Sequence, residues 1–326
     1  HLRRDPDLEP IRGEEMYLAI LEAADRQERQ AAEKILDDWK REYGTEGYRF
    51  EIDTDRRLAF ATALDDVSHE EMREMLAEQT DHLAKTLFDA PPSYYVLVAI
   101  PTTRDADRYF NGDRSIGGQY VHGEHRLVSR DIGVSLRHEF VHAMHYGQME
   151  RIGVHRAHPI WILEGLATLY ETYSIEGDGT VEFHPNERWN IVKNLHRANR
   201  LTRWSHVMSM SSDSFMRRAT RLYPEVRAIF EYVADQGKLT EWYRMYLETA
   251  RDDRSGQVAF EKTFGKPLEE IEDDWRDWIG RRQGVDLRVE AGDASLGIEG
   301  HPRGGNDGVV IAEVFSRSSA SQGGLR

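Results

Sequence analysis

The sequence predicts an α+β protein with a mixed α/β N-terminal subdomain, a helical C-terminal subdomain and a small β module at its end. Three observations lead to this prediction. Residues 46–130 mix helical periodicity with short runs of β-branched and aromatic residues, which are typical of strands. Residues 131–285 keep a helical spacing of apolar residues, and residues 286–326 become rich in Gly and Ser. Residues 1–45 are predicted to form a charged tail and a helix.

The composition excludes several classes of protein. With 7 Trp, 14 Tyr and 11 Phe in 326 residues, the chain carries far more aromatic side chains than disordered segments do. No apolar run approaches the roughly 18 residues of a membrane-spanning helix, so we expect no transmembrane segment. A net charge of −15 argues against nucleic acid as a partner. The lack of cysteine excludes disulfides, a thiol nucleophile and Cys-containing metal sites.

Two long helices and several strands are predicted before residue 131. The first helix covers 14–43, where apolar residues recur every three to four positions until Gly44 ends it. The residues of this apolar stripe are Tyr17, Ile20, Ala24, Ala31, Ile35 and Trp39. The second runs from Ser68 to Phe88, because Ser68 and Glu71 match a capping box. Strands are expected at 48–52 and 58–63 as a hairpin and at 94–100. Residues 116–129 are expected to form two short strands, or an edge strand with a turn at Gly123.

The second half of the chain is predicted to be helical as far as Arg282. Its apolar residues repeat at helical spacing in successive segments, and no strand is expected between them. These segments are 132–153, 158–174, 185–199, 211–219, 223–236, 239–250 and 267–282.

The sequence His-Glu-Phe-Val-His at 138–142 is the strongest chemical signal. Residues four apart lie on one face of a helix, so His138 and His142 can present two imidazoles to one metal ion. Glu139 lies next to them and can reach a water molecule at that ion. The segment therefore predicts a metal site with its own general base.

Glu164 is the predicted third ligand. It lies in Trp-Ile-Leu-Glu-Gly-Leu-Ala, the most apolar stretch of the chain, where an unpaired charge would cost several kcal/mol. A metal ion would neutralise this carboxylate, although an ion pair with Arg is an alternative. Gly165 and Ala167 are small, which we expect to let this helix pack closely on the helix that carries the two histidines.

Three other histidines compete as the third ligand. His145 follows His142 by three residues on the same helix, and His155 and His158 lie in the loop that comes next. The sequence does not match the longer pattern HExxHxxGxxH, because residue 148, at the position of its third histidine, is Gln148. We favour Glu164.

The motif HEFVH followed by WxxEGxA resembles the gluzincin metallopeptidases, and most closely the peptidase-MA-like family of bacteria. The resemblance covers residues 48–282, including Gly-Gly-Gln-Tyr at 117–120 and the segment 260–279. It implies a zincin-like fold in which His138, His142 and Glu164 bind one Zn²⁺ per chain. It also implies that Glu139 is the catalytic base.

Further residues follow from this resemblance. The family has a supporting carboxylate four residues after the metal-binding glutamate, where this chain has Thr168, and Glu171 is a substitute one turn later. Tyr223 matches the position of a tyrosine that supports the oxyanion, although a structural tyrosine is an alternative. The strand ahead of the motif is expected to pair with an extended substrate. Its residues are Gly117, Gly118, Gln119 and Tyr120.

The C-terminal module, residues 286–326, resembles part of a PDZ domain. Ser295, Leu296, Gly297 and Ile298 resemble its carboxylate-binding loop, and 308–315 resembles the following strand. The resemblance implies a C-terminal peptide as a possible ligand. Any other small β unit is the alternative.

These features together predict a zinc metallopeptidase that acts on a peptide or protein. Two alternatives remain. One is a PDZ-containing peptide-binding or scaffold protein whose zincin fold has no catalytic activity, and the other is a zinc aminopeptidase or other amide hydrolase. The chain begins at His1 rather than Met, so we expect an extracytoplasmic protein from which a signal peptide has been removed.

Overall fold

The computed structural model describes residues 13–285 except 155 and 178, together with 298–302 and 309–314. The chain divides into two compact units, His1–Gln283 and Gly284–Arg326. The first unit is mixed α and β with a helical C-terminal part, as the sequence predicts. Within the described residues, no helix has the combination of length and apolar character that a membrane crossing requires.

A five-stranded sheet forms the centre of the N-terminal part, with the strand order β1-β2-β3-β5-β4. Its strands are β1 (Arg49–Asp53), β2 (Leu58–Thr62), β3 (Val96–Ile100), β4 (Gly118–Val121) and β5 (Arg126–Ser129). The predicted hairpin of β1 and β2 is confirmed, as is the pair β4 and β5, which pack antiparallel. β2, β3 and β5 run parallel, and all residues of β2 and β3 are buried. β4 is therefore an edge strand of the sheet.

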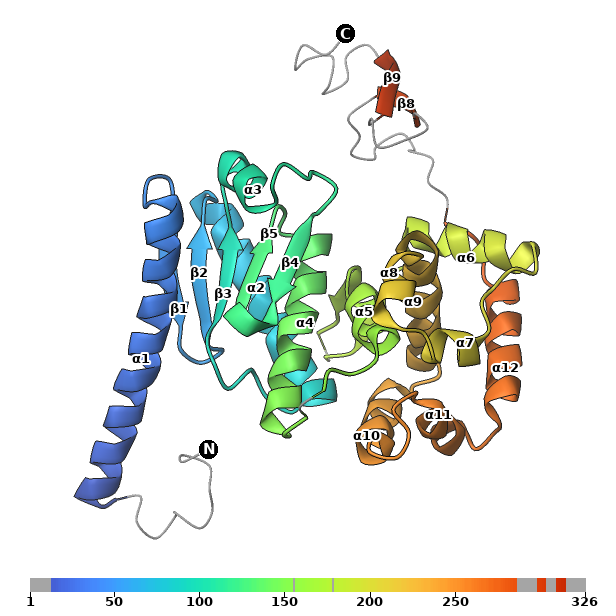
Figure 1. Cartoon of the computed structure of the whole chain (residues 1–326), viewed down its shortest axis with the longest axis horizontal. Coiled ribbons are helices and arrows are strands. Elements are labelled where there is room, and N and C mark those ends of the chain that lie inside the picture. Colours follow the sequence, from blue (N-terminus) through green and yellow to red (C-terminus); the bar gives the residue numbers. More distant parts are fainter. Residues whose placement is uncertain (1–12, 155, 178, 286–297, 303–308, 315–326) are drawn as a thin grey trace. The chain divides into compact units, whose positions relative to one another are not determined.

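Helix α1 (Glu15–Tyr43) covers one face of this sheet together with α3 (Thr103–Tyr109) (Figure 1). Leu36 and Trp39 pack there on alanines of β2 and β3. The predicted stripe of α1 is partly wrong, because Ile20 is exposed and Ala32 is buried instead of Ala31. Gly44 ends the helix as predicted, with a positive φ of 83° and its N–H bonded to the carbonyl of Lys40.

Helix α2 (Asp66–Leu83) covers the opposite face and continues into the π-helical turn η2 (Ala84–Phe88). His69 of α2 hydrogen-bonds to Thr62 of β2 and lies edge-on to Phe60. The predicted cap is wrong: Asp65, not Ser68, is the N-cap residue. Ser68 already lies in the first turn, and its backbone N–H donates to the carboxylate of Asp65.

Helix α4 (Val134–Arg151) lies between the sheet and the helical part of the unit (Figure 1). It packs on β4, β5 and α2 on one side and on α5 (Ile160–Leu169) on the other. The remaining helices are α6 (Glu187–Arg197), α7 (Trp204–Met208), α8 (Ser212–Met216), α9 (Ala219–Asp235), α10 (Leu239–Thr249), α11 (Gln257–Phe264) and α12 (Leu268–Arg281).

Two predictions for this helical part are wrong. The helix expected over 158–174 ends at Leu169, and a hairpin of β6 (Tyr173–Ile175) and β7 (Val181–Phe183) follows. Tyr173 and Ile175 are better suited to a strand than to a helix. Helix α9 begins at Ala219, so Pro224 lies inside it rather than at its start. Since proline has no N–H, the carbonyl of Thr220 loses its intrahelical partner.

Gly165 packs against α9 and not, as expected, against α4. A Cβ on Gly165 would collide with the ring of Phe230 and meet Val226 at 3.4 Å. The same ring stacks on Trp161, so α5 and α9 share a closely packed aromatic core.

We expect Gly165→Ala to lower the free energy of unfolding by about 1–3 kcal/mol, although helix propensity alone would favour alanine by about 1 kcal/mol. Urea denaturation measures the difference. Gly177→Ala is the matched control, because a Cβ there meets no atom within 4 Å. Equal stability of the two variants would show that the contact between α5 and α9 is looser than described.

The second unit contains an antiparallel hairpin of β8 (Ile298–Pro302) and β9 (Val309–Val314), with an irregular register between Glu299 and Gly300. Ile298 begins β8, whereas Leu296 and Gly297 of the predicted PDZ loop lie outside the described residues. The PDZ resemblance therefore stays a prediction.

Candidate metal centre

His138, His142 and Glu164 converge from two helices, as predicted. Nε2 of His138 and Nε2 of His142 are 3.2 Å apart, and Oε2 of Glu164 lies 3.2 Å and 3.5 Å from them. Atoms that bind one tetrahedral ion at about 2.0–2.1 Å lie about 3.3 Å from one another. All three side chains are buried. These residues can hold one metal ion with little rearrangement.

The polar atoms of this cluster point to the same conclusion. Oε2 of Glu164 is buried and accepts no hydrogen bond within the described part of the chain. An unsatisfied buried carboxylate oxygen is costly, and a cation would satisfy it. Burial alone would raise the pKa of Glu164, but the imidazoles of His142 and His138 lower it below its ordinary value. The environment thus favours positive charge beside this carboxylate.

Glu171 contacts the second imidazole nitrogen of His138, and Arg188 in turn holds Glu171. Nδ1 of His138 lies 3.1 Å from Oε1 of Glu171, and Glu171 receives two hydrogen bonds from Arg188 at 2.9 Å and 3.0 Å. Burial on its own would lower the pKa of His138, but the carboxylates of Glu164 and Glu171 raise it to about 10. A carboxylate on the second nitrogen of a metal-binding imidazole fixes its orientation. Glu171 therefore occupies the supporting position.

Thr168 faces the helix backbone. Its hydroxyl donates to the carbonyl of Glu164 at 2.7 Å and lies 3.1 Å from the carbonyl of Gly165. Its hydroxyl is therefore engaged by the backbone of its own helix, and the carboxylate beside the imidazole of His138 comes from Glu171.

Glu139 lies between the metal cluster and the edge strand β4. The backbone N–H of Tyr120 donates to its Oε2 at 2.8 Å. A Cβ on Gly118 would come within 2.9 Å of Cγ of Glu139, and a Cβ on Gly117 would collide with the hydroxyl of Ser135. The two glycines are needed because β4 approaches α4 this closely.

The outer edge of β4 faces the same cleft. The N–H of Arg130 donates to the carbonyl of Gly117, so residue pairs 117/130 and 119/128 carry the ladder bonds to β5. In an antiparallel pair the alternate residues point their backbone groups outward. The backbone groups of Gly118 and Tyr120 therefore lie on the free edge, where one of them already holds Glu139.

The ligand cluster, Glu139 and the edge of β4 line one cleft of about 850 Å³. Its walls come from β4, α4, α5 and α9, which are remote in sequence. Its lining includes Gly117, Gly118, Gln119, Tyr120, Ser135, His138, Glu139, His142, Tyr146, Leu163, Glu164, Glu171, Arg188 and Tyr223.

Tyr223 lies in this cleft near the predicted ligands. Its ring centroid is 6.2 Å from that of His138, and the guanidinium of Arg188 lies 5.6 Å from the Tyr223 ring. Burial and the negative charge of Glu164 raise the pKa of Tyr223 above its ordinary value. The phenol is therefore protonated at neutral pH and able to donate a hydrogen bond.

Two of the competing histidines, His145 and His158, pair with each other. His145 and His158 contact each other through Nε2 and Nδ1 at 2.8 Å, and His145 stacks on Phe88. His155 lies outside the described residues. Gln148 donates to the carbonyl of Leu87 at 3.2 Å. Among the described candidates, Glu164 is therefore the residue that completes the cluster.

Arg188 is the residue of the site that the sequence analysis missed. The sequence predicts a helix at this position, but no spacing connects Arg188 with Glu171, which lies 17 residues earlier. The two residues meet because the β6–β7 hairpin lies between them in the chain. A scan against models of known protein families finds no match for this chain, and a search of curated proteins finds none either, so the chemistry of the site carries the functional argument.

Proposed function

We propose that this chain is a zinc-dependent peptidase that cleaves internal bonds of an extended polypeptide. One observation carries the proposal: three potential ligand atoms at tetrahedral spacing share a cleft with the carboxylate of Glu139 and the outer edge of β4. The fold would then be of the zincin type.

Zinc is the metal that this donor set favours. Two imidazoles and one carboxylate are typical of catalytic zinc, which keeps a fourth position open. Calcium and magnesium prefer oxygen ligands and are less suited to a site with two nitrogen donors. When bound, zinc lowers the pKa of a water molecule towards 7 and polarises a carbonyl oxygen.

Glu139 would transfer the proton from the attacking water to the leaving nitrogen. Hydrolysis adds the hydroxyl of water to the carbonyl carbon and its proton to the amine nitrogen that leaves. Glu139 can take this proton as the water attacks and then deliver it to the nitrogen. The N–H of Tyr120 holds one carboxylate oxygen, Oε2, in place at 2.8 Å.

The edge of β4 would hold the substrate. An extended peptide can add to a sheet edge through backbone hydrogen bonds, which do not depend on its side chains. The outward N–H and carbonyl of Gly118 and the carbonyl of Tyr120 are suited to this pairing, while the N–H of Tyr120 holds Glu139. The carbonyl to be cleaved would then face the ligand cluster.

Tyr223 would stabilise the oxyanion. Its protonated phenol comes from α9 and lies in the cleft, with its ring centroid 6.2 Å from that of His138. A positioned donor of this type stabilises the charge that develops on the carbonyl oxygen.

The carboxylates of the cleft favour an endopeptidase over an aminopeptidase. An aminopeptidase needs an acidic group that binds the amino terminus of its substrate. The acidic residues among the described lining are Glu139, Glu164 and Glu171. Glu164 belongs to the ligand cluster, Glu171 pairs with His138 and Arg188, and Glu139 is the proposed base. None of the three remains for the amino terminus.

A digest of a proteome-derived peptide library tests the proposal. The full chain with Zn²⁺ should generate internal cleavages, which a chelator abolishes and added Zn²⁺ restores. Mass spectrometry of the new termini identifies the bonds. Stepwise shortening from the amino terminus would instead indicate an aminopeptidase, and intact peptides would favour a binding protein without turnover.

A further inference from the structure

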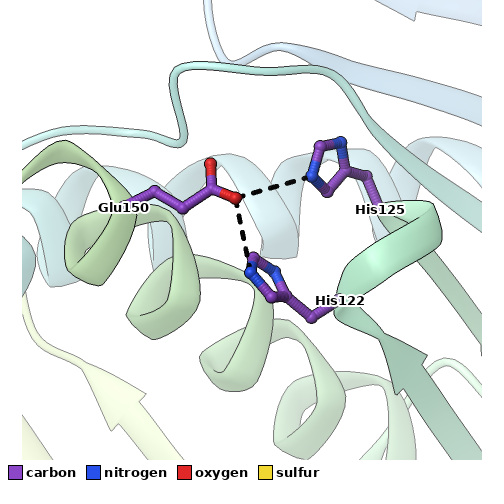
Figure 2. A group of neighbouring side chains, drawn as sticks. All are labelled: His122, His125 and Glu150. Atoms are coloured by element: carbon purple, nitrogen blue, oxygen red, sulfur yellow. Dashed lines mark ion pairs between the residues drawn. The ribbon is translucent and has the colours of Figure 1, made fainter. Parts of the chain in front are cut away.

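A second cluster of metal-binding side chains lies outside the proposed catalytic site. Figure 2 shows the imidazoles of His122 and His125 directed towards one oxygen of Glu150. Nε2 of His122 is 3.3 Å and Nε2 of His125 is 3.9 Å from Oε1 of Glu150. One ligand atom from each residue lies within 4.8 Å of the others. The first distance equals the spacing of ligands around tetrahedral zinc, and the second exceeds it by about half an ångström.

The backbone brings these three residues together. His122 begins the short 3-10 turn η3 (His122–Glu124) between β4 and β5, and His125 follows it with a φ of 49°. This left-handed conformation is uncommon for a residue other than glycine. Glu150 comes from the last turn of α4. The turn thereby directs two imidazoles at one carboxylate on a neighbouring helix.

Aromatic rings hold both imidazoles in these orientations. Tyr94 stacks on His125 with a centroid distance of 3.6 Å and an interplanar angle of 10°. Tyr146 stacks on His122 at 4.5 Å and 25°. Nδ1 of His122 is buried without a hydrogen-bond partner in the described part of the chain, so Nε2 is the nitrogen that faces a ligand. The side chains need little reordering to bind an ion.

No arginine or lysine of the described residues forms an ion pair with Glu150. Its ion-pair contacts among the described residues are the two histidines, which compensate it only when protonated. The neighbouring Arg151 is directed to the carbonyl of Phe88 and to Asp89. A divalent cation would satisfy all three groups while leaving both imidazoles neutral.

We propose that His122, His125 and Glu150 form a second zinc site. Two imidazole nitrogens and one carboxylate oxygen suit a divalent metal of zinc type rather than calcium or magnesium. The three side chains are between 31% and 42% exposed, so solvent water can complete the coordination. This exposure also makes the second site weaker than the buried cluster.

Both sites include residues from one stripe of α4, but they are separate. His138, His142, Tyr146 and Glu150 follow one another at intervals of four residues. Eight residues separate His142 from Glu150, which corresponds to about 12 Å along the helix axis. Paired catalytic metals are about 3.5–4 Å apart, so the second ion would not take part in the bond cleavage.

The expected role of the second ion is to clamp the turn after β4 to the end of α4. It would join His122, which directly follows β4, to a helix that also carries Glu139. The N–H of Tyr120 that holds Glu139 lies two residues before His122. Binding of the ion should therefore stiffen the edge strand without contacting the substrate.

Zinc titration of the full metal-depleted chain tests this site. We expect two equivalents of Zn²⁺ by calorimetry, one tight and one weaker. His122→Ala and the conservative Glu150→Gln should each lose the weaker equivalent and keep the tight one. His206→Ala, which removes an exposed histidine of α7, is the matched control and should bind both.

The double variant His138→Ala/His142→Ala separates this inference from the proposed peptidase function. It should lose the tight equivalent and keep the weaker one. A wild-type chain that binds no more zinc than its Glu150→Gln variant would overturn the second site, whatever the outcome for peptidase activity.

Hydrogen exchange tests the clamp itself. Addition of the second equivalent of Zn²⁺ should slow amide exchange in residues 118–126 of the wild-type chain, and not in Glu150→Gln. Binding of two equivalents with unchanged exchange would contradict the clamp.

Discussion

Glu139→Gln should retain zinc and fold but lose peptidase activity by about 10²–10⁴-fold, the usual contribution of a general base. The amide has the size of the carboxylate and still accepts the N–H of Tyr120, which now bonds Oε2 at 2.8 Å. The position of β4 should therefore persist. What the substitution removes is the ability to take a proton from water.

Initial rates on a peptide identified in the library digest measure this loss, with the zinc content determined in the same samples. Glu74→Gln, on the exposed side of α2, is the matched control and should keep full activity. Unchanged turnover in Glu139→Gln would show that the cleavage occurs elsewhere or comes from a contaminant.

The parts of the site that are local in sequence could be predicted. His138, Glu139 and His142 occupy consecutive turns of one helix, so their geometry follows from helical periodicity alone. Glu164 could be predicted for a different reason, since a carboxylate in an apolar segment needs a positive partner. Gly117 and Gly118 belong to a motif that the sequence shows, but their close packing against Ser135 and Glu139 can be recognised only in the folded structure.

Contacts between remote segments could not be predicted in this way. Glu171 and Arg188 meet because the chain turns through β6 and β7, where a continuous helix was expected. Glu150 lies 28 residues after His122 in the sequence. The two residues meet because α4 packs beside β4, the strand that precedes His122. The N-cap of α2 was predicted wrongly for a local reason. Asp65 and Ser68 are both good capping residues, and the backbone conformation decides which of them caps the helix.

Removal of either imidazole should abolish stoichiometric zinc binding at the buried cluster. His138→Ala or His142→Ala leaves two ligands, which fix an ion far less well than three. Glu164→Ala should have a similar effect, because its Oε2 lies within 3.5 Å of both nitrogens. Metal analysis after dialysis at a defined free Zn²⁺ concentration measures the loss, in a Glu150→Gln background so that the second cluster does not contribute.

Two further variants show whether the ligands are correctly assigned. His145→Ala should keep the tight equivalent, because His145 pairs with His158 and not with the cluster. Glu171→Gln should keep it as well but bind zinc about 10–100-fold more weakly, the usual cost of losing the partner of a metal-binding histidine. If His145→Ala loses the metal while Glu164→Ala retains it, the third ligand is misassigned, and the cleft no longer contains the geometry on which the peptidase proposal depends.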